Sequence, residues 1–132
     1  MVDNMNYWII NHSWDSFVKT KEYCGFINKD ERDLIHIDAN IIYYGQGVIF
    51  GLFKVIDLVN NEFNGWKKAY PYQIKISSIM VSERGLVAKQ FQERFMLLRE
   101  DNEYQNLIKL TENEFNLIKR SLENKDKTLI LK

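Results

Sequence analysis

The feature that most constrains the fold is the long apolar run in GQGVIFGLFKVIDLV, residues 45–59. Its β-branched and aromatic residues are typical of a strand, and Gly51 lies where a strand needs a bulge or a close backbone approach. The segment just before it, IIYY at residues 41–44, has a similar composition, and the intervening glycines indicate a turn. Together the two segments predict a β-hairpin.

Two further segments predict strands. Tyr7–Ile10 is short, aromatic and β-branched, which suits a first strand. In residues 71–81, PYQIKISSIMV, apolar and polar residues alternate, and Pro71 stands at the start, where a missing N–H costs least. Residues 83–99, ERGLVAKQFQERFMLLR, fit a helix or a strand equally well, because Val87, Phe91 and Phe95 have helical spacing but FMLL also suits a strand.

Two segments carry helix signals. Ser13 can cap a helix that begins at Trp14, with Trp14, Phe17 and Val18 on one apolar face. Near the end of the chain, Thr111 and Glu114 form a capping box ahead of an apolar stripe made by Phe115, Ile118 and Leu122. Residues 123–132 have no cap and no apolar face, so we expect a loose tail there.

The order of these elements and the length of the chain predict one domain over residues 1–132, with its core in residues 6–122. The fold class is α+β, a twisted sheet of about five or six strands that curls toward a barrel, with helices packed at its side.

Composition argues against several classes of protein. The 18 basic residues balance the 18 acidic ones, which argues against a protein that coats nucleic acid or acidic membranes by bulk electrostatics, although a local basic groove stays open. Cys24 is the only cysteine and the two histidines are scattered, so we expect no disulfide, zinc site or other cofactor. The sequence has no run of 18 apolar residues and no signal-peptide pattern, so we expect a cytoplasmic protein without a membrane partner.

No motif indicates an enzyme. His12, Ser13 and Asp15 are triad residue types, but a triad is assembled from separate elements that converge in space. The carboxylates of Asp30, Glu31 and Asp33 lie in a charged run without apolar flanks that could raise a pKa, so we expect a solvated face. The glycines of GQGVIFG lack the lysine and hydroxyl of a phosphate-binding loop.

Trp66 lies in a polar, turn-forming segment, NNEFNGWKKA at residues 60–69. Loop tryptophans often fold back as core plugs, and this remains one interpretation. The other is a stacking platform for a base, with Lys67 and Lys68 available to phosphates.

In this order the segments resemble the EVE domain family, which belongs to the PUA-like superfamily and is related to the YTH readers of methylated adenine. The resemblance covers residues 6–122: the YWI strand, the polar turn and short helix, YCGF, IIYYG, VIFGLFKV, PYQIKI and the LTENEF helix. It implies a PUA-like curled β-barrel with a pocket in which aromatic side chains enclose a modified base flipped out of its stack.

The resemblance also implies site residues. Asn11, His12 and Ser13 occupy the turn that supplies polar contacts to base and backbone, with Trp14 counted beside them as a support for this rim. Tyr23 or Cys24 falls where relatives have a cage tryptophan, and Trp66 falls where the YTH branch has another wall. The side chains expected to meet phosphates are Lys29, Arg32, Lys67 and Lys68.

The function that follows is a non-enzymatic module that recognises a modified nucleobase in DNA or RNA. Some members of the family are reader modules of restriction systems, which implies a fusion or association of that kind. Two alternatives stay open: a small-molecule or nucleotide-binding domain that uses the same pocket, and a protein-interaction module with Trp66 as its hot spot.

Overall fold

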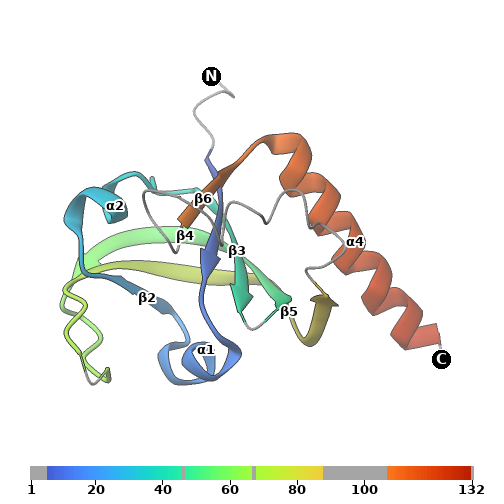
Figure 1. Ribbon diagram of the computed structural model, residues 1–132, viewed down its shortest axis with the longest axis horizontal. Coiled ribbons are helices and arrows are strands. Elements are labelled where there is room, and N and C mark those ends of the chain that lie inside the picture. The colour runs from blue at the N-terminus through green and yellow to red at the C-terminus, as the bar shows by residue number, and fades with distance from the viewer. Residues whose placement is uncertain (1–5, 46, 67, 88–106, 132) are drawn as a thin grey trace.

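The computed structural model describes residues 6–45, 47–66, 68–87 and 107–131. Its strands form one six-stranded sheet in the order β2-β5-β4-β3-β1-β6 (Figure 1). The strands are β1 (Tyr7–Asn11), β2 (Tyr23–Phe26), β3 (Asn40–Gly45), β4 (Val48–Asn60), β5 (Tyr72–Val87) and β6 (Leu107–Leu110). The helices are α1 (Trp14–Thr20), α2 (Lys29–Asp33) and α4 (Glu112–Leu131). The predicted α+β class with a curled sheet and flanking helices is confirmed.

The β3–β4 hairpin is confirmed, and so is the irregularity at Gly51. The two strands pair antiparallel, and the pairing of β4 with β5 shifts register between Ile49 and Gly51. A Cβ added at Gly51 would collide with the ring of Phe53, so a side chain there would displace part of the core. The register shifts along β4 and β5 let these long strands bend, which curls the sheet.

β1 is an interior strand of the sheet. It pairs parallel with β3 on one side and antiparallel with β6 on the other, so strands that are far apart in the sequence flank it. Its residues alternate between two clusters of buried side chains, one on each face of the sheet. Tyr7 and Ile9 face α4, whereas Trp8 and Ile10 face the cluster that α1 covers.

Helix α4 lies along one side of the sheet (Figure 1). The capping box is confirmed: the Thr111 amide donates to Glu114 Oε1 at 2.9 Å, and the Glu114 amide donates to Thr111 Oγ1 at 3.1 Å. The expected stripe of Phe115, Ile118 and Leu122 is buried against the sheet. The helix continues to Leu131, through most of the segment in which the sequence predicts a loose tail. Once a helix is nucleated, each further residue adds a hydrogen bond without a new nucleation cost.

Helix α1 begins at Trp14 as expected, and Ser13 Oγ accepts from the Ser16 amide at 3.1 Å. Val18 does not share the buried face, because its side chain is 53% exposed. Trp14 and Phe17 pack against the aromatic cluster and Thr20 at the end of the helix is buried, since a seven-residue helix presents only a narrow stripe to the core.

The ambiguous segment is a strand as far as Val87, where β5 ends, and its remainder lies outside the described residues. Among the helices described, none has the length and apolarity needed to cross a membrane.

Candidate functional site

Two adjoining hollows open between the β1–α1 turn, β2 and the loop that precedes β5. The Trp66 hollow has a volume of about 190 Å³ and is lined by Asn11, His12, Ser13, Ser16, Gly25, Trp66 and Tyr70. The Glu31 hollow has a volume of about 140 Å³ and shares Asn11, His12, Gly25 and Tyr70 with it. The further lining residues of the Glu31 hollow are Ile10, Cys24, Phe26, Ile27, Asn28 and Glu31.

The polar turn after β1 is held in place by the core beneath it. The His12 amide donates to the Tyr44 carbonyl at 2.9 Å, which ties the turn to β3. The His12 ring stacks on the buried Tyr43 ring with 4.3 Å between centroids and 3° between planes. Burial lowers the pKa of His12 to about 4, so its imidazole is neutral at neutral pH. Its Nδ1–H donates to the Ser13 carbonyl at 3.3 Å, which leaves Nε2 of the neutral ring as an acceptor for a ligand.

Trp66 folds back onto β2. Its ring meets Phe63 edge to face at 4.6 Å and Tyr70 edge to face at 5.1 Å. A Cβ built on Gly25 would lie 2.8 Å from Trp66 Cη2 and 2.6 Å from Tyr70 Cβ, so the indole packs against bare backbone. The side chain is half-buried and forms one wall of the Trp66 hollow. Trp66 is therefore packed and at the same time presented to the hollow.

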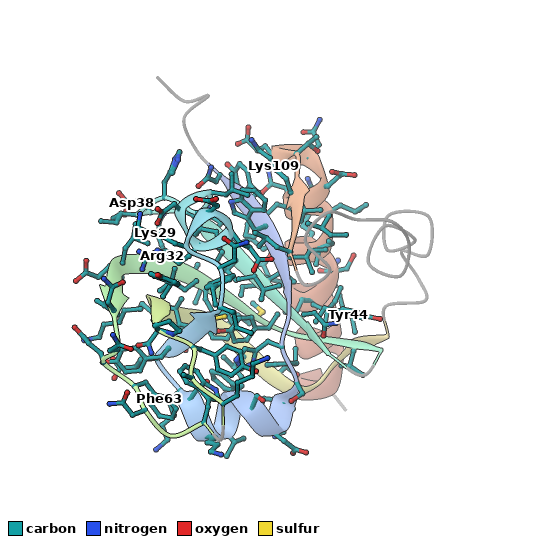
Figure 2. The ribbon with its side chains drawn as sticks, turned by 60° about the vertical axis from the view of Figure 1, so that its left-hand side comes forward. Lys29, Arg32, Asp38, Tyr44, Phe63 and Lys109 are labelled. Atoms are coloured by element: carbon teal, nitrogen blue, oxygen red, sulfur yellow. The ribbon has the colours of Figure 1, made fainter. Side chains whose placement is uncertain are left out.

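Arg32, which the resemblance implies as a phosphate contact, is used inside the fold. Its side chain is buried, and Nη1 donates to the Val59 carbonyl at 2.8 Å and the Gln73 carbonyl at 3.0 Å. Its Nε donates to Asp33 Oδ1 at 2.8 Å. Figure 2 shows Arg32 on α2 beside the long strands, with Lys29 on the same helix. The guanidinium thus fastens α2 to β4 and β5.

Glu31 departs from the expected solvated face. It is half-buried, it lines the Glu31 hollow, and burial raises the pKa of its carboxyl. Within the described chain, its carboxylate has no hydrogen bond or ion pair. Asp30 and Asp33 are exposed, as the sequence predicts.

Other predicted site residues lie apart from the two hollows. Trp14 packs against Phe17 and Phe50 beneath α1, and it lines neither hollow. Tyr23 stacks on Phe63, which Figure 2 labels at lower left, and its hydroxyl donates to Glu62 Oε1 at 3.0 Å. Both residues support the walls instead of forming them.

The cysteine and the lysines have different positions. Cys24 lies buried at the base of the Glu31 hollow, and burial raises the pKa of its thiol to about 12. Lys29 is exposed and pairs with Asp33 at 2.6 Å. Lys68 is exposed and lines a third hollow, of about 220 Å³, that also borders Trp66 and Tyr70. Lys67 lies outside the described residues.

Sequence reasoning missed Tyr70, Gly25 and Glu31 as lining residues. Tyr70 follows Trp66 by four positions in the same loop, a spacing that could have suggested a second aromatic wall. Glu31 lies three residues after Asn28, whose side chain caps α2 by accepting from the Asp30 amide at 2.8 Å. That capping residue is the signal that could have indicated an ordered helix there. In the described parts of the chain, no group of three histidine, cysteine or acidic side chains could hold a metal ion.

No protein-family model matches the sequence, and no curated protein matches it. Among solved structures, a complex of the YTH domain-containing protein mmi1 with RNA has a TM-score of 0.71 at 15% identity, over 97% of this chain and 87% of that chain. A hypothetical protein from Leishmania major has a TM-score of 0.66 at 12% identity, over 96% of this chain and 99% of that chain. Protein Atu2648 from Agrobacterium tumefaciens has a TM-score of 0.55 at 18% identity, over 88% of this chain and 92% of that chain. The chain has a YTH-like fold.

Proposed function

We propose that this protein is a non-enzymatic module that binds RNA by taking one flipped-out nucleobase into the Trp66 hollow. One observation carries the proposal: neutral polar side chains and an aromatic wall converge on the same hollow. The β1–α1 turn supplies Asn11, His12 and Ser13, and the loop before β5 supplies Trp66 and Tyr70. A flipped base needs a flat face to stack on and hydrogen-bonding groups for its edge, which repay the cost of unstacking.

Two observations narrow the chemical class of the ligand. Two similar structures are complexes of Mmi1 or its YTH domain with RNA, which favours RNA over DNA. The resemblance to the EVE family favours a base that carries a modification such as a methyl group, for which Trp66 and Tyr70 would provide apolar contact. Membership of the EVE family, association with a restriction system and a cytoplasmic location are part of the same proposal.

The chemistry of the hollows favours binding over catalysis. The Cys24 thiol is protonated at neutral pH, and only the thiolate is a strong nucleophile. No acidic side chain lines the Trp66 hollow with His12. Glu31 lines the adjoining hollow with His12, but in the described chain the Nδ1 atom of His12 contacts the Ser13 carbonyl and not a carboxylate, so the orienting member of a triad is missing.

A nucleotide-binding domain is the second candidate, and the balanced charge of the chain favours it. Such a protein would bind a free modified nucleoside as tightly as the same base within an oligonucleotide. Equilibrium binding of the two ligands by calorimetry separates the candidates, because an RNA-binding module gains affinity from backbone contacts.

The direct test replaces one wall of the hollow. Base–aromatic stacking predicts that Trp66→Ala weakens binding to an oligoribonucleotide with the preferred modified base by roughly 5- to 150-fold, measured by fluorescence anisotropy. Trp14→Ala is the matched control, because Trp14 is also half-buried against aromatic neighbours but lies outside the hollow. Both variants should melt at lower temperature, and only Trp66→Ala should lose affinity below the melting transition. Equal affinity of the two variants would contradict the proposal.

A further inference from the structure

We infer that Glu31 reads the edge of the bound base and selects a guanine-type base. The inference rests on the proposed function, since it places a base in the Trp66 hollow with one edge in the adjoining Glu31 hollow. The two hollows share Asn11, His12, Gly25 and Tyr70, so a flat ligand against the aromatic wall of one reaches the other.

The first support is the state of the carboxylate. Glu31 is half-buried without a hydrogen bond or ion pair in the described chain, and a ligand that filled the hollow would remove water from its carboxylate, which is unfavourable for an unpaired charge. A ligand that supplies N–H donors would relieve this cost. Glu31 is therefore a polar group whose partner is expected to come from outside the chain.

The second support is the anchoring of helix α2, which holds Glu31 toward the hollow. Arg32, the next residue, is buried and bonded to carbonyls of both β4 and β5. Asn28 caps the first turn of the helix and lines the same hollow as Glu31. With α2 fixed at both positions, the backbone of Glu31 is held beside the hollow, so only its side chain has to be ordered when a ligand binds.

The third support is the complementarity of hydrogen-bonding groups. An ionised carboxylate only accepts hydrogen bonds, and its two oxygens match two adjacent donors. Guanine presents such a pair, N1–H and the N2 amino group, on one edge. Adenine, cytosine and uracil present an acceptor next to each donor on that edge, so one carboxylate oxygen would face a lone pair. A ligand that leaves a polar group of the site buried and unpaired is bound much more weakly.

In this arrangement each hollow contacts a different edge of the base. The edge of guanine that carries N1 and N2 would lie at Glu31, which leaves the imidazole side of the base near Trp66 and Tyr70. A methyl group on that side would meet aromatic surface. A methyl group on N1 would instead replace a donor that Glu31 needs.

The experiment compares oligoribonucleotides of one sequence whose central base is guanine, hypoxanthine, 7-methylguanine, 7-methylhypoxanthine or N6-methyladenine. Hypoxanthine, the base of inosine, differs from guanine only by the missing N2 amino group. We expect the native protein to prefer each guanine over its hypoxanthine partner by about 10- to 150-fold, as for a hydrogen bond to a charged group. Glu31→Gln should reduce this ratio to within about threefold, because the amide offers only one acceptor.

Asp30→Asn is the matched control, since it removes the same charge from the same helix at an exposed position outside both hollows. It should preserve the preference for guanine. Melting curves of both variants establish that they are folded, and neither change alters side-chain size.

The outcomes separate the two proposals. If the native protein binds N6-methyladenine best, or if Glu31→Gln keeps the native ratio, Glu31 does not read the edge and base binding itself stands. If no oligonucleotide binds, both proposals are wrong. A trimethyl-lysine peptide is included as a further probe, because a carboxylate beside aromatic rings also suits a cation. Binding of the peptide that is lost in Glu31→Gln would overturn the assignment to guanine.

Discussion

His12 joins the core to the candidate site more directly than any other residue of the turn. Its amide is bonded to β3, its ring stacks on Tyr43, and its side chain lines both hollows. The stacking fixes the plane of the imidazole, and burial keeps it neutral. A ligand therefore meets an oriented polar group without first having to neutralise or order it.

The lowered pKa of His12 makes stability depend on pH. Burial lowers the pKa from 6.5 to about 4 in the folded protein, so between these values the unfolded chain binds more protons than the folded one. The free energy of unfolding should therefore fall as the pH drops below about 6.5, and this loss should level off below about pH 4. Urea unfolding of the native protein and His12→Gln, from about pH 7.5 to about pH 4.5, should show a flatter profile for the variant.

His36→Gln is the control for this measurement, because it makes the same change of side chain at an exposed position. The raised pKa of Glu31 acts with the opposite sign, because it favours the folded state as the pH falls. Glu31 is present in all three proteins, so its contribution cancels in the differences. Identical profiles for His12→Gln and the native protein would show that His12 is not held neutral by the fold.

The roles of Glu31 and Arg32 could not be assigned from sequence. Both belong to a charged run, and a run of that kind usually faces solvent on all sides. Which member turns inward depends on how α2 docks against β4 and β5, and that contact is made with residues 27 and 41 positions away in the chain. Asn11, His12 and Ser13 were placed in the site by the resemblance to the EVE family, and the Trp66 hollow opens beside the turn that they form.

At the scale of elements, α2 depends on tertiary contacts for its existence. A helix of five residues is too short to be stable alone, so its buried arginine and its cap must hold it. The carbonyls of Val59 and Gln73 accept from the buried side chain of Arg32. The helix is thus held by the end of β4 and the start of β5.

This dependence predicts a large effect of Arg32→Met. The substitution keeps much of the apolar stem but removes every donor, and we expect it to lower the free energy of unfolding by about 2 to 4 kcal/mol in urea titrations. Lys29→Met on the same helix removes an exposed pair with Asp33 and should change stability little. Equal and small effects of the two substitutions would mean that Arg32 does not anchor the helix.

Local signals account for the elements that the sequence predicts well. The β3–β4 hairpin, the Ser13 cap and the Thr111–Glu114 box all depend on residues within a few positions of one another. The parallel pairing of β1 with β3 has no such signal, because two separate strands must meet without a connecting turn. The extension of α4 past Leu122 also lacked a local signal, since the residues beyond it show neither a cap nor an apolar face.

At the scale of the whole molecule, the balanced charge limits how RNA can be bound. Arg32 is buried and Lys29 is paired, so Lys68 is the exposed cation that the described residues place beside the aromatic wall. We expect about 2 to 4 phosphate contacts, and therefore a slope of log affinity against log salt concentration of roughly −1.5 to −3.5. Anisotropy titrations over a range of potassium chloride concentrations measure this slope. A slope near about −8 would require a basic surface much larger than these residues provide.

The position of β1 affects how the protein is made. This strand is synthesised before the other strands of the sheet, yet one of its two neighbours is β6, the last of the described strands, so that Tyr7 pairs with Leu110. Until β6 is synthesised, one side of β1 presents unpaired backbone groups that another chain can engage. The described sheet therefore cannot be completed before β6 has been synthesised, and the yield of the protein in a cell should depend on how well that open side is protected until then.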